Sequence, residues 1–353
     1  MNFKRNDRVT GSTGDLEFDR RIEELVQDWQ PGPHQRLYQE MITTILRMAK
    51  DEFAEADLKL ISRTLKELRN AANVFRPYQH VRKVTVFGSA RTAPEEMEFK
   101  AAEAFGRKLK DLGFMVLTGG GDGIMGAAQK GAGRRHSFGL NINLPFEQRA
   151  NETIEGDEKL VMINYFFTRK LNFLKETHAI VLFPGGFGTM DEGFEALTLM
   201  QTGKARIMPL ILVDKPGGTY WKTWYDFVKN HLLRLKLISP ADFHLFSMTD
   251  DIDVAAEEIL LFYKNFHSYR WVRDEMSIRI MKPLTEDAVK LLDQDFRDLL
   301  VQGNIRQREL LPQERNEPKL ASLPRIVLSP DRHQFGRIRQ LIDAINRSPV
   351  EAG

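Results

Sequence analysis

The sequence predicts an α/β fold with a doubly wound parallel sheet, and three observations carry this prediction. Short apolar runs alternate with amphipathic segments between residues 81 and 265. Glycine-rich turns follow three of these runs, and two of the turns open directly into helices. Strands that alternate with helices are typical of a parallel sheet with helices on both faces. We therefore expect a Rossmann-like sheet, whose ligands bind at the carboxyl ends of its strands.

Three parts are expected along the chain. Residues 1–80 form an N-terminal segment that is predicted to be helical from residue 16 onward, 81–268 form the Rossmann-like domain, and 269–353 form a small α+β unit. Apolar residues between 58 and 75 recur in steps of three and four, as in a packed helical seam. We favour a helical layer docked on the main domain over a subunit interface, because the repeat is shorter than a coiled coil needs.

The apolar runs and their periodicity place the elements of the two folded parts. In the Rossmann-like domain, strands are predicted at 83–87, 114–118, 137–144, 179–183 and 207–213, an edge strand at 243–246, and helices at 95–112, 168–176, 219–235 and 250–265. In the C-terminal unit, strands are predicted at 276–280, 305–310 and 325–328, and helices at 285–301 and 335–345.

Composition excludes several classes of function. The net charge of +2 gives no global field for nucleic acid or a membrane surface. Cysteine is absent, which excludes disulfides, thiolate metal sites and a cysteine nucleophile. We also find no histidine at metal-ligand spacing, no serine nucleophile elbow, no signal peptide and no apolar run of membrane-spanning length. The expected location is the cytoplasm.

The three glycine turns are the main candidate binding elements. Glycine lets a backbone approach a ligand closely, and free N–H groups at the start of a helix favour an anion. Because the strands are predicted to be parallel, all three turns would meet at one edge of the sheet. The second turn lacks the Gly-Lys-Ser/Thr of a P-loop. The candidate substrate-binding residues on these turns are Gly88, Ser89, Gly119, Gly120, Gly121, Met125, Gly185, Gly186, Gly188 and Thr189.

The second turn also supports a rival interpretation. Residues 121–126 match the dinucleotide fingerprint, and Glu147 follows about 20 residues later, where a ribose-binding acid would lie. This pattern indicates a nicotinamide-dependent enzyme. Against it, the match follows the second predicted strand and not the first.

Charged residues next to the turns are candidates for chemistry. With Thr168 as the N-cap, Arg169 and Lys170 would lie in the first turn of a helix, where the macrodipole disfavours cations. We favour a functional role for Arg169, whereas for Lys170 function and a simple ion pair are equally supported. Thr189 and Glu192 have the spacing of a capping box, so Glu192 has a structural explanation as well as a catalytic one.

The C-terminal unit is rich in arginine, which allows an anionic effector or RNA as a ligand. A solvated face is the favoured explanation, because the net charge is balanced. The arginines are Arg306, Arg308, Arg315, Arg325, Arg332, Arg337 and Arg339.

Residues 184–192, PGGFGTMDE, resemble the PGGxGTxxE signature of the LOG family, the nucleotide 5′-monophosphate phosphoribohydrolases that are often labelled lysine decarboxylases. The resemblance extends over residues 81–265 and includes the other two glycine turns and the Arg-Lys pair at 169–170. It implies hydrolysis of the N-glycosidic bond of a nucleoside 5′-monophosphate, most readily AMP. The catalytic residues it implies are Arg169 and Glu192, and Lys170 joins the glycine turns in binding substrate.

The resemblance also implies that no metal or redox cofactor is needed. Members of the family are dimers or larger assemblies, so the helix that follows Glu192 is the expected interface. A non-catalytic nucleotide-binding or regulatory protein on the same fold is the second hypothesis, and a nicotinamide-dependent oxidoreductase is the third.

Overall fold

The computed structural model describes residues 12–29, 32–143, 149–314 and 317–351. The chain divides into two compact units, residues 1–66 and 67–353, which are described separately below. None of the helices in the described ranges combines the length and the apolar character that a membrane crossing needs.

The first unit is helical. It contains α1 (Leu16–Trp29), α2 (Gln35–Lys50) and the beginning of α3 (Glu55–Phe75). The prediction of one helical region without breaks was wrong, because α2 ends at Lys50 and Glu52 takes a left-handed φ of 55° before α3 begins. Helix α1 contacts α2, and its side chains Ile22 and Val26 are buried.

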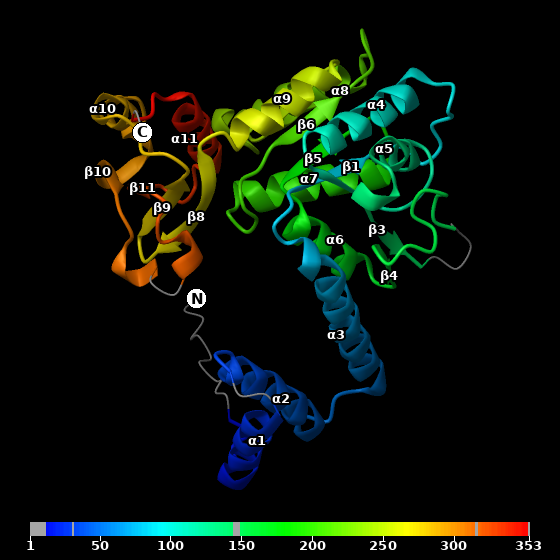
Figure 1. Cartoon of the computed structure of the whole chain (residues 1–353), viewed down its shortest axis with the longest axis vertical. Coiled ribbons are helices and arrows are strands. Elements are labelled where there is room, and N and C mark those ends of the chain that lie inside the picture. Colours follow the sequence, from blue (N-terminus) through cyan, green and yellow to red (C-terminus); the bar gives the residue numbers. More distant parts are fainter. Residues whose placement is uncertain (1–11, 30–31, 144–148, 315–316, 352–353) are drawn as a thin grey trace. The chain divides into compact units, whose positions relative to one another are not determined.

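A seven-stranded parallel sheet forms the centre of the second unit, as predicted (Figure 1). The strands follow the order β4-β3-β2-β1-β5-β6-β7. Their bounds are β1 (Lys83–Phe87), β2 (Met115–Thr118), β3 (Ser137–Ile142), β4 (Leu160–Ile163), β5 (Ala179–Leu182), β6 (Leu210–Val213) and β7 (Ser247–Thr249). Strand β4 was not predicted from the sequence.

Helices cover both faces of this sheet, because the side chains of each buried strand alternate between two hydrophobic clusters. In β5, Val181 belongs to the cluster under α4, α5 and α9, and its neighbour Leu182 belongs to the cluster under α6, α7 and α8. Figure 1 shows α4, α5 and α9 on one side and α6 and α7 on the other. The helices are α4 (Met97–Asp111), α5 (Ile124–Ala132), α6 (Phe166–Glu176), α7 (Phe187–Gln201), α8 (Tyr220–Phe227) and α9 (Ile252–Phe262).

Two glycines allow α4 and α5 to pack with their backbones in contact. A Cβ atom on Gly131 would lie 1.8 Å from the carbonyl oxygen of Glu103, and one on Gly106 would lie 2.0 Å from the carbonyl oxygen of Ala128. Neither position leaves room for a side chain, so the helix pair depends on both glycines.

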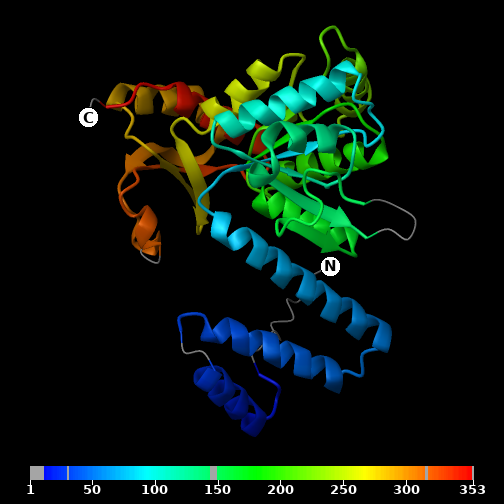
Figure 2. The same ribbon diagram turned by 45° about the vertical axis from the view of Figure 1, so that its right-hand side comes forward.

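A second, antiparallel sheet lies beside the parallel one (Figure 2), and it confirms the predicted α+β unit. Its order is β10-β11-β9-β8, and the hydrophobic cluster under α4 and α9 continues into it. The elements are β8 (Phe266–Val272), β9 (Glu275–Ile280), α10 (Glu286–Asp295), β10 (Leu300–Arg308), β11 (Arg325–Pro330) and α11 (Phe335–Arg347).

Two predicted elements were wrong. The helix predicted at 285–301 ends at Asp295, because the chain from Leu300 onward pairs with β11. The edge strand predicted at 243–246 lies in a 3₁₀ helix, Pro240–Leu245, which Ser239 and Asp242 begin with a reciprocal capping box. The edge of the sheet is formed by β7 instead.

The solvated arginine face was also wrong for two of its residues. Arg325 is completely buried and pairs with Glu314 at 3.1 Å. Arg339 is buried and pairs with Glu258 and Asp343. Arg315 lies outside the described residues. The two buried guanidinium groups therefore stabilise the packing of the C-terminal unit and do not form a solvated face.

Candidate active site

The loops after β1, β2 and β5 meet at the carboxyl edge of the sheet, because these strands are neighbours in the order β2-β1-β5. Hydrogen bonds join them. The Ser89 amide donates to the carbonyl of Pro184 at 3.0 Å, and the Ile124 amide donates to the carbonyl of Ser89 at 3.0 Å. The three glycine turns therefore form one continuous wall.

The glycines of this wall have two different roles. A Cβ atom on Gly88 would lie 2.6 Å from Ile124, and one on Gly185 would lie 2.9 Å from the Ser89 nitrogen, so these two glycines permit contact between loops. Gly186 and Gly188, at the start of α7, have no atom within 4 Å of the corresponding position. This second pair leaves open space in which a ligand can approach the backbone.

A cavity of about 750 Å³ lies against this wall. Ten of the predicted site residues line it: Gly88, Ser89, Gly119, Met125, Arg169, Gly185, Gly186, Gly188, Thr189 and Glu192. Gly120, Gly121 and Lys170 do not. The carbonyls of Gly120 and Gly121 instead accept hydrogen bonds from the side-chain amide of Asn151, at 3.0 and 2.9 Å.

Two residues that were not predicted also line the cavity. Arg91 lines it from the loop after β1, and Tyr220 lines it from the start of α8. The Tyr220 hydroxyl donates to the carbonyl of Gly185 and so holds the third glycine turn. No local pattern in the sequence indicated that these residues belong to the site. Tyr220, for example, lies 35 residues along the chain from Gly185, to which it is hydrogen-bonded.

The capping box predicted for Thr189 and Glu192 is wrong. Helix α7 begins at Phe187 with Gly186 as its N-cap, so Thr189 lies inside the helix and Glu192 lies in its second turn. The Glu192 side chain therefore cannot form the hydrogen bond of a capping box with the backbone N–H of the N-cap residue. Its carboxylate is buried and faces the cavity.

The N-cap predicted for α6 is wrong in the same way. The helix begins at Phe166 with Tyr165 as its N-cap, which moves Arg169 and Lys170 into the second turn. Thr168 donates its hydroxyl to Glu67 at 2.6 Å. Glu67 comes from α3 and also accepts from the backbone and side-chain nitrogens of Asn164, at 2.9 and 2.8 Å. This buried carboxylate fixes the start of α6 and thus the position of Arg169.

Two helices bring the charged residues of the site together. Arg169 Nη2 on α6 lies 3.6 Å from Glu192 Oε1 on α7. Lys170 Nζ lies 2.8 Å from Asp191, 2.7 Å from Glu195 and 3.5 Å from Glu192. Lys170 is therefore held as the centre of an ion-pair cluster, behind the cavity wall.

Arg169 is held mainly by aromatic rings. Its guanidinium carbon lies 5.0 Å from the ring centroid of Phe166 and 5.9 Å from that of Phe173. Its buried Nε has no hydrogen-bond acceptor among the described residues. A buried donor without an acceptor is costly, so an oxygen atom of a ligand would be stabilising there.

The protonation of this cluster is set by burial and by its neighbours. Burial raises the pKa of Glu192 above its ordinary value, although Lys170 and Arg169 oppose the shift. Burial also lowers the pKa of Arg169, against the attraction of Glu192 and Asp191. For Lys170, burial is outweighed by Asp191, Glu195 and Glu192, and the pKa is raised. The site thus holds a carboxyl group with a raised pKa beside two cations.

The described residues contain no group of three or more histidine, aspartate or glutamate side chains that fits a metal ion. Glu147, the acid that the dinucleotide interpretation requires, lies outside the described residues.

Comparison with known proteins shows what this domain is similar to. A family described as "Possible lysine decarboxylase" matches residues 125–259, a range that contains Arg169 and residues 184–192. Similar curated proteins bear the names of nucleotide nucleosidases and phosphoribohydrolases. This part of the chain is similar to the LOG family.

Three relatives illustrate the similarity. A pyrimidine/purine nucleotide 5′-monophosphate nucleosidase of Escherichia coli K12 is 28 % identical over 147 residues, 39 % of this chain and 32 % of the relative. A probable cytokinin riboside 5′-monophosphate phosphoribohydrolase of Oryza sativa subsp. japonica is 32 % identical over 35 % of this chain and 54 % of the relative. A protein of Arabidopsis thaliana with that activity in its name is 28 % identical over 42 % and 67 %. The chain thus spans about a third to two thirds of the relatives' lengths.

Solved structures cover a similar part of the chain. The molybdenum cofactor carrier protein of Chlamydomonas reinhardtii is 20 % identical, with a TM-score of 0.36, over 51 % of this chain and 98 % of the other. A molybdenum cofactor binding protein of Rippkaea orientalis is 18 % identical, with a TM-score of 0.35, over 51 % and 94 %.

Proposed function

We propose that this protein is a member of the LOG family, that it hydrolyses the N-glycosidic bond of nucleoside 5′-monophosphates, with AMP as the preferred substrate, and that it releases the free base and ribose 5-phosphate. The observation that carries the proposal is the pair of Arg169 and Glu192 beside a cavity walled by three glycine turns. The names of the relatives give independent support for this class of reaction.

The geometry suits each step of the reaction. The N-terminus of α7, where Gly186 and Gly188 leave the backbone open, is a place for the 5′-phosphate. When the C1′–N bond breaks, its electron pair leaves with the base and positive charge develops on the ribose. The carboxylate of Glu192 stabilises this charge. Water then adds to C1′, and its proton is released to the departing base. Arg169 offers its unpaired Nε–H to an oxygen of the substrate.

A lysine decarboxylase is not supported by the same residues. That chemistry needs a lysine that forms a Schiff base with pyridoxal phosphate, and such a lysine reacts as a neutral amine. No lysine lines the described cavity, and the pKa of nearby Lys170 is raised by three carboxylates. The residues present do not fit this cofactor.

The proposal is tested by incubating the full-length protein with AMP, GMP, IMP, CMP and UMP and separating free bases by chromatography. We expect adenine from AMP at the highest rate, with ribose 5-phosphate in equal amount. Binding of AMP with no base released from any substrate would indicate the non-catalytic alternative. Binding of NADH without any hydrolysis would indicate the oxidoreductase.

We further propose that two or more copies associate through the exposed faces of α6 and α7, and that the protein acts in the cytoplasm. Phe187 is 96 % exposed beside the cavity, and Phe166, Phe167 and Leu171 on α6 are each about half exposed. An exposed apolar patch of this kind marks an interaction surface. Light scattering after size exclusion should give at least twice the chain mass of 40.7 kDa. Leu171→Asp should reduce that mass to one chain, and a monomeric wild type would contradict the proposal.

A further inference from the structure

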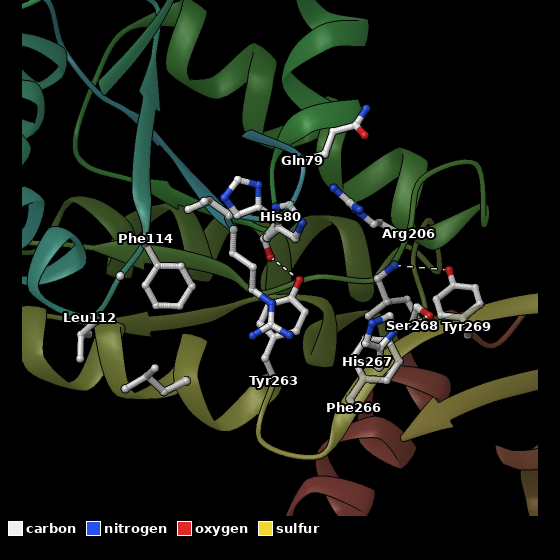
Figure 3. A pocket seen from close by; sticks show the side chains of 16 residues that line it. Gln79, His80, Leu112, Phe114, Arg206, Tyr263, Phe266, His267, Ser268 and Tyr269 are labelled. Atoms are coloured by element: carbon white, nitrogen blue, oxygen red, sulfur yellow. Dashed lines mark hydrogen bonds between the residues drawn. The ribbon is translucent and has the colours of Figure 1, made fainter. Parts of the chain in front are cut away.

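A second cavity, of about 760 Å³, lies at the opposite end of the parallel sheet from the candidate active site (Figure 3). Arg82 and His178 line it, and these residues immediately precede β1 and β5. The candidate active site follows the carboxyl ends of the same two strands. Residues of β8, including His267, close the cavity on the side of the antiparallel sheet. The two cavities therefore share strands but no lining residues.

The lining of this cavity is cationic. It contains two arginines, Arg82 and Arg206, and three histidines, whereas no aspartate or glutamate lines it. The guanidinium of Arg82 lies 4.2 Å from the ring centroid of Tyr263, and no described carboxylate contributes to its pKa shift. Arg206 donates to the carbonyls of Lys175 and Thr177 and likewise has no described carboxylate partner. Two arginines without acidic partners leave uncompensated positive charge in the cavity.

The histidines respond to this charge. Burial, together with the positive charges of Arg206, Lys83 and Arg82, lowers the pKa of His178 to about 3. Its Nδ1 accepts a hydrogen bond from the Lys83 amide at 3.2 Å, so the proton of the neutral ring is on Nε2. Burial, Arg82 and Arg279 likewise lower the pKa of His267. The imidazoles of His178 and His267 are thus held neutral, so the positive charge of the lining resides on the two guanidinium groups.

Aromatic rings complete the lining. Figure 3 shows Phe114, Tyr263 and Phe266 around the same space, with Arg206 and His80 at its border. Tyr263 is fixed by its hydroxyl, which donates to the carbonyl of His178 at 2.6 Å. The volume is in the range of small-molecule sites, roughly 300–1,000 Å³. A ligand here would meet cationic donors and flat apolar walls.

We propose that this cavity is a second binding site and that it takes small phosphate esters. A phosphate monoester carries about two negative charges and three acceptor oxygens, and the lining offers it two guanidinium groups without acidic neighbours in the lining. A ligand with a single carboxylate group carries one negative charge and would neutralise only one of the two arginines, so a phosphate ester fits the charge of the cavity better. The site is separate from the hydrolytic site and does not depend on the proposed reaction.

Calorimetric titration of the full-length protein with ribose 5-phosphate tests the proposal. We expect Arg82→Gln combined with Arg206→Gln to weaken one phosphate-dependent binding event by about tenfold or more, since charge-assisted hydrogen bonds are among the strong ones. Inorganic phosphate, AMP and uncharged adenosine serve as further probes. Binding of inorganic phosphate at the same site would show that the phosphate group suffices, and tighter binding of AMP would show that the aromatic walls hold a base.

Two controls keep the result interpretable. Arg135→Gln removes an exposed arginine that lines neither cavity, and it should leave all binding unchanged. His267→Phe removes an N–H donor while both arginines remain, and it should weaken the same event in a protein with the wild-type melting temperature. Unchanged affinity in both the folded arginine variant and His267→Phe would overturn the proposal, as would equal binding of adenosine at that site.

Discussion

Replacement of Glu192 by glutamine should lower the rate of base release about 10³-fold, the size of effect expected when a group that stabilises transition-state charge is removed. Glutamine has nearly the same shape but carries no charge, so it cannot stabilise the positive ribose. The helix start does not depend on this side chain, because Gly186 is the N-cap of α7. Steady-state release of adenine from AMP, measured with the folded variant, checks this expectation.

The same variant should unfold at a temperature at least as high as the wild type at pH 7. Because the folded pKa of Glu192 is raised above its ordinary value, the stability that this group contributes is present below its unfolded pKa of about 4.5 and is lost as the pH rises through the folded pKa. Glutamine stays neutral throughout. The difference in melting temperature between variant and wild type should therefore grow as the pH rises from 4 to 7.

Asp191→Asn is the matched control for this experiment. Asp191 is the neighbouring acid and pairs with Lys170 at 2.8 Å, but it does not line the cavity. We expect this variant to lose less than about tenfold in rate, as for an exposed ion pair. Equal rates for the Glu192→Gln variant and the wild type would exclude Glu192 as the catalytic carboxylate.

Replacement of Gly131 by alanine should destabilise the second unit by about 3 kcal/mol, which is the upper part of the usual range for overpacking. The added methyl group would lie 1.8 Å from the Glu103 carbonyl oxygen and 2.9 Å from the Arg107 nitrogen. Both are backbone atoms of α4, so no side chain can move aside and the two helices must separate. Denaturant unfolding followed by circular dichroism measures the loss.

Gly188→Ala provides the comparison for that measurement. Gly188 lies in the first turn of α7 with no atom within 4 Å of the added methyl position. The free energy of unfolding of the Gly188→Ala variant should equal that of the wild type or exceed it by about 0.5–1 kcal/mol, because alanine has a higher helix propensity than glycine. If Gly131→Ala were as stable as Gly188→Ala, the close contact between α4 and α5 would be refuted.

Most of the fold was predictable from local patterns. The wrongly predicted elements lie where contacts with distant segments override the local preference of the chain. Apolar runs such as Ala179–Leu182 are buried on both faces, and this property is visible in the sequence itself. Residues 296–301 continued a helical pattern, but pairing with β11 made a strand of the chain from Leu300 onward. In the same way, the 3₁₀ helix at Pro240–Leu245 displaced the predicted edge strand by a few residues.

Within the candidate site, the sequence by itself determined the glycine turns and the residue types beside them, because these depend on short segments that follow buried strands. Only the tertiary structure decided their roles. It moved Glu192 and Arg169 into second helical turns, placed them 3.6 Å apart and put Lys170 behind the wall. It also brought Glu67 and Tyr220 to the site from distant helices. The physical reason is that side-chain contacts between distant helices are set by how those helices pack on the sheet, which no local pattern encodes.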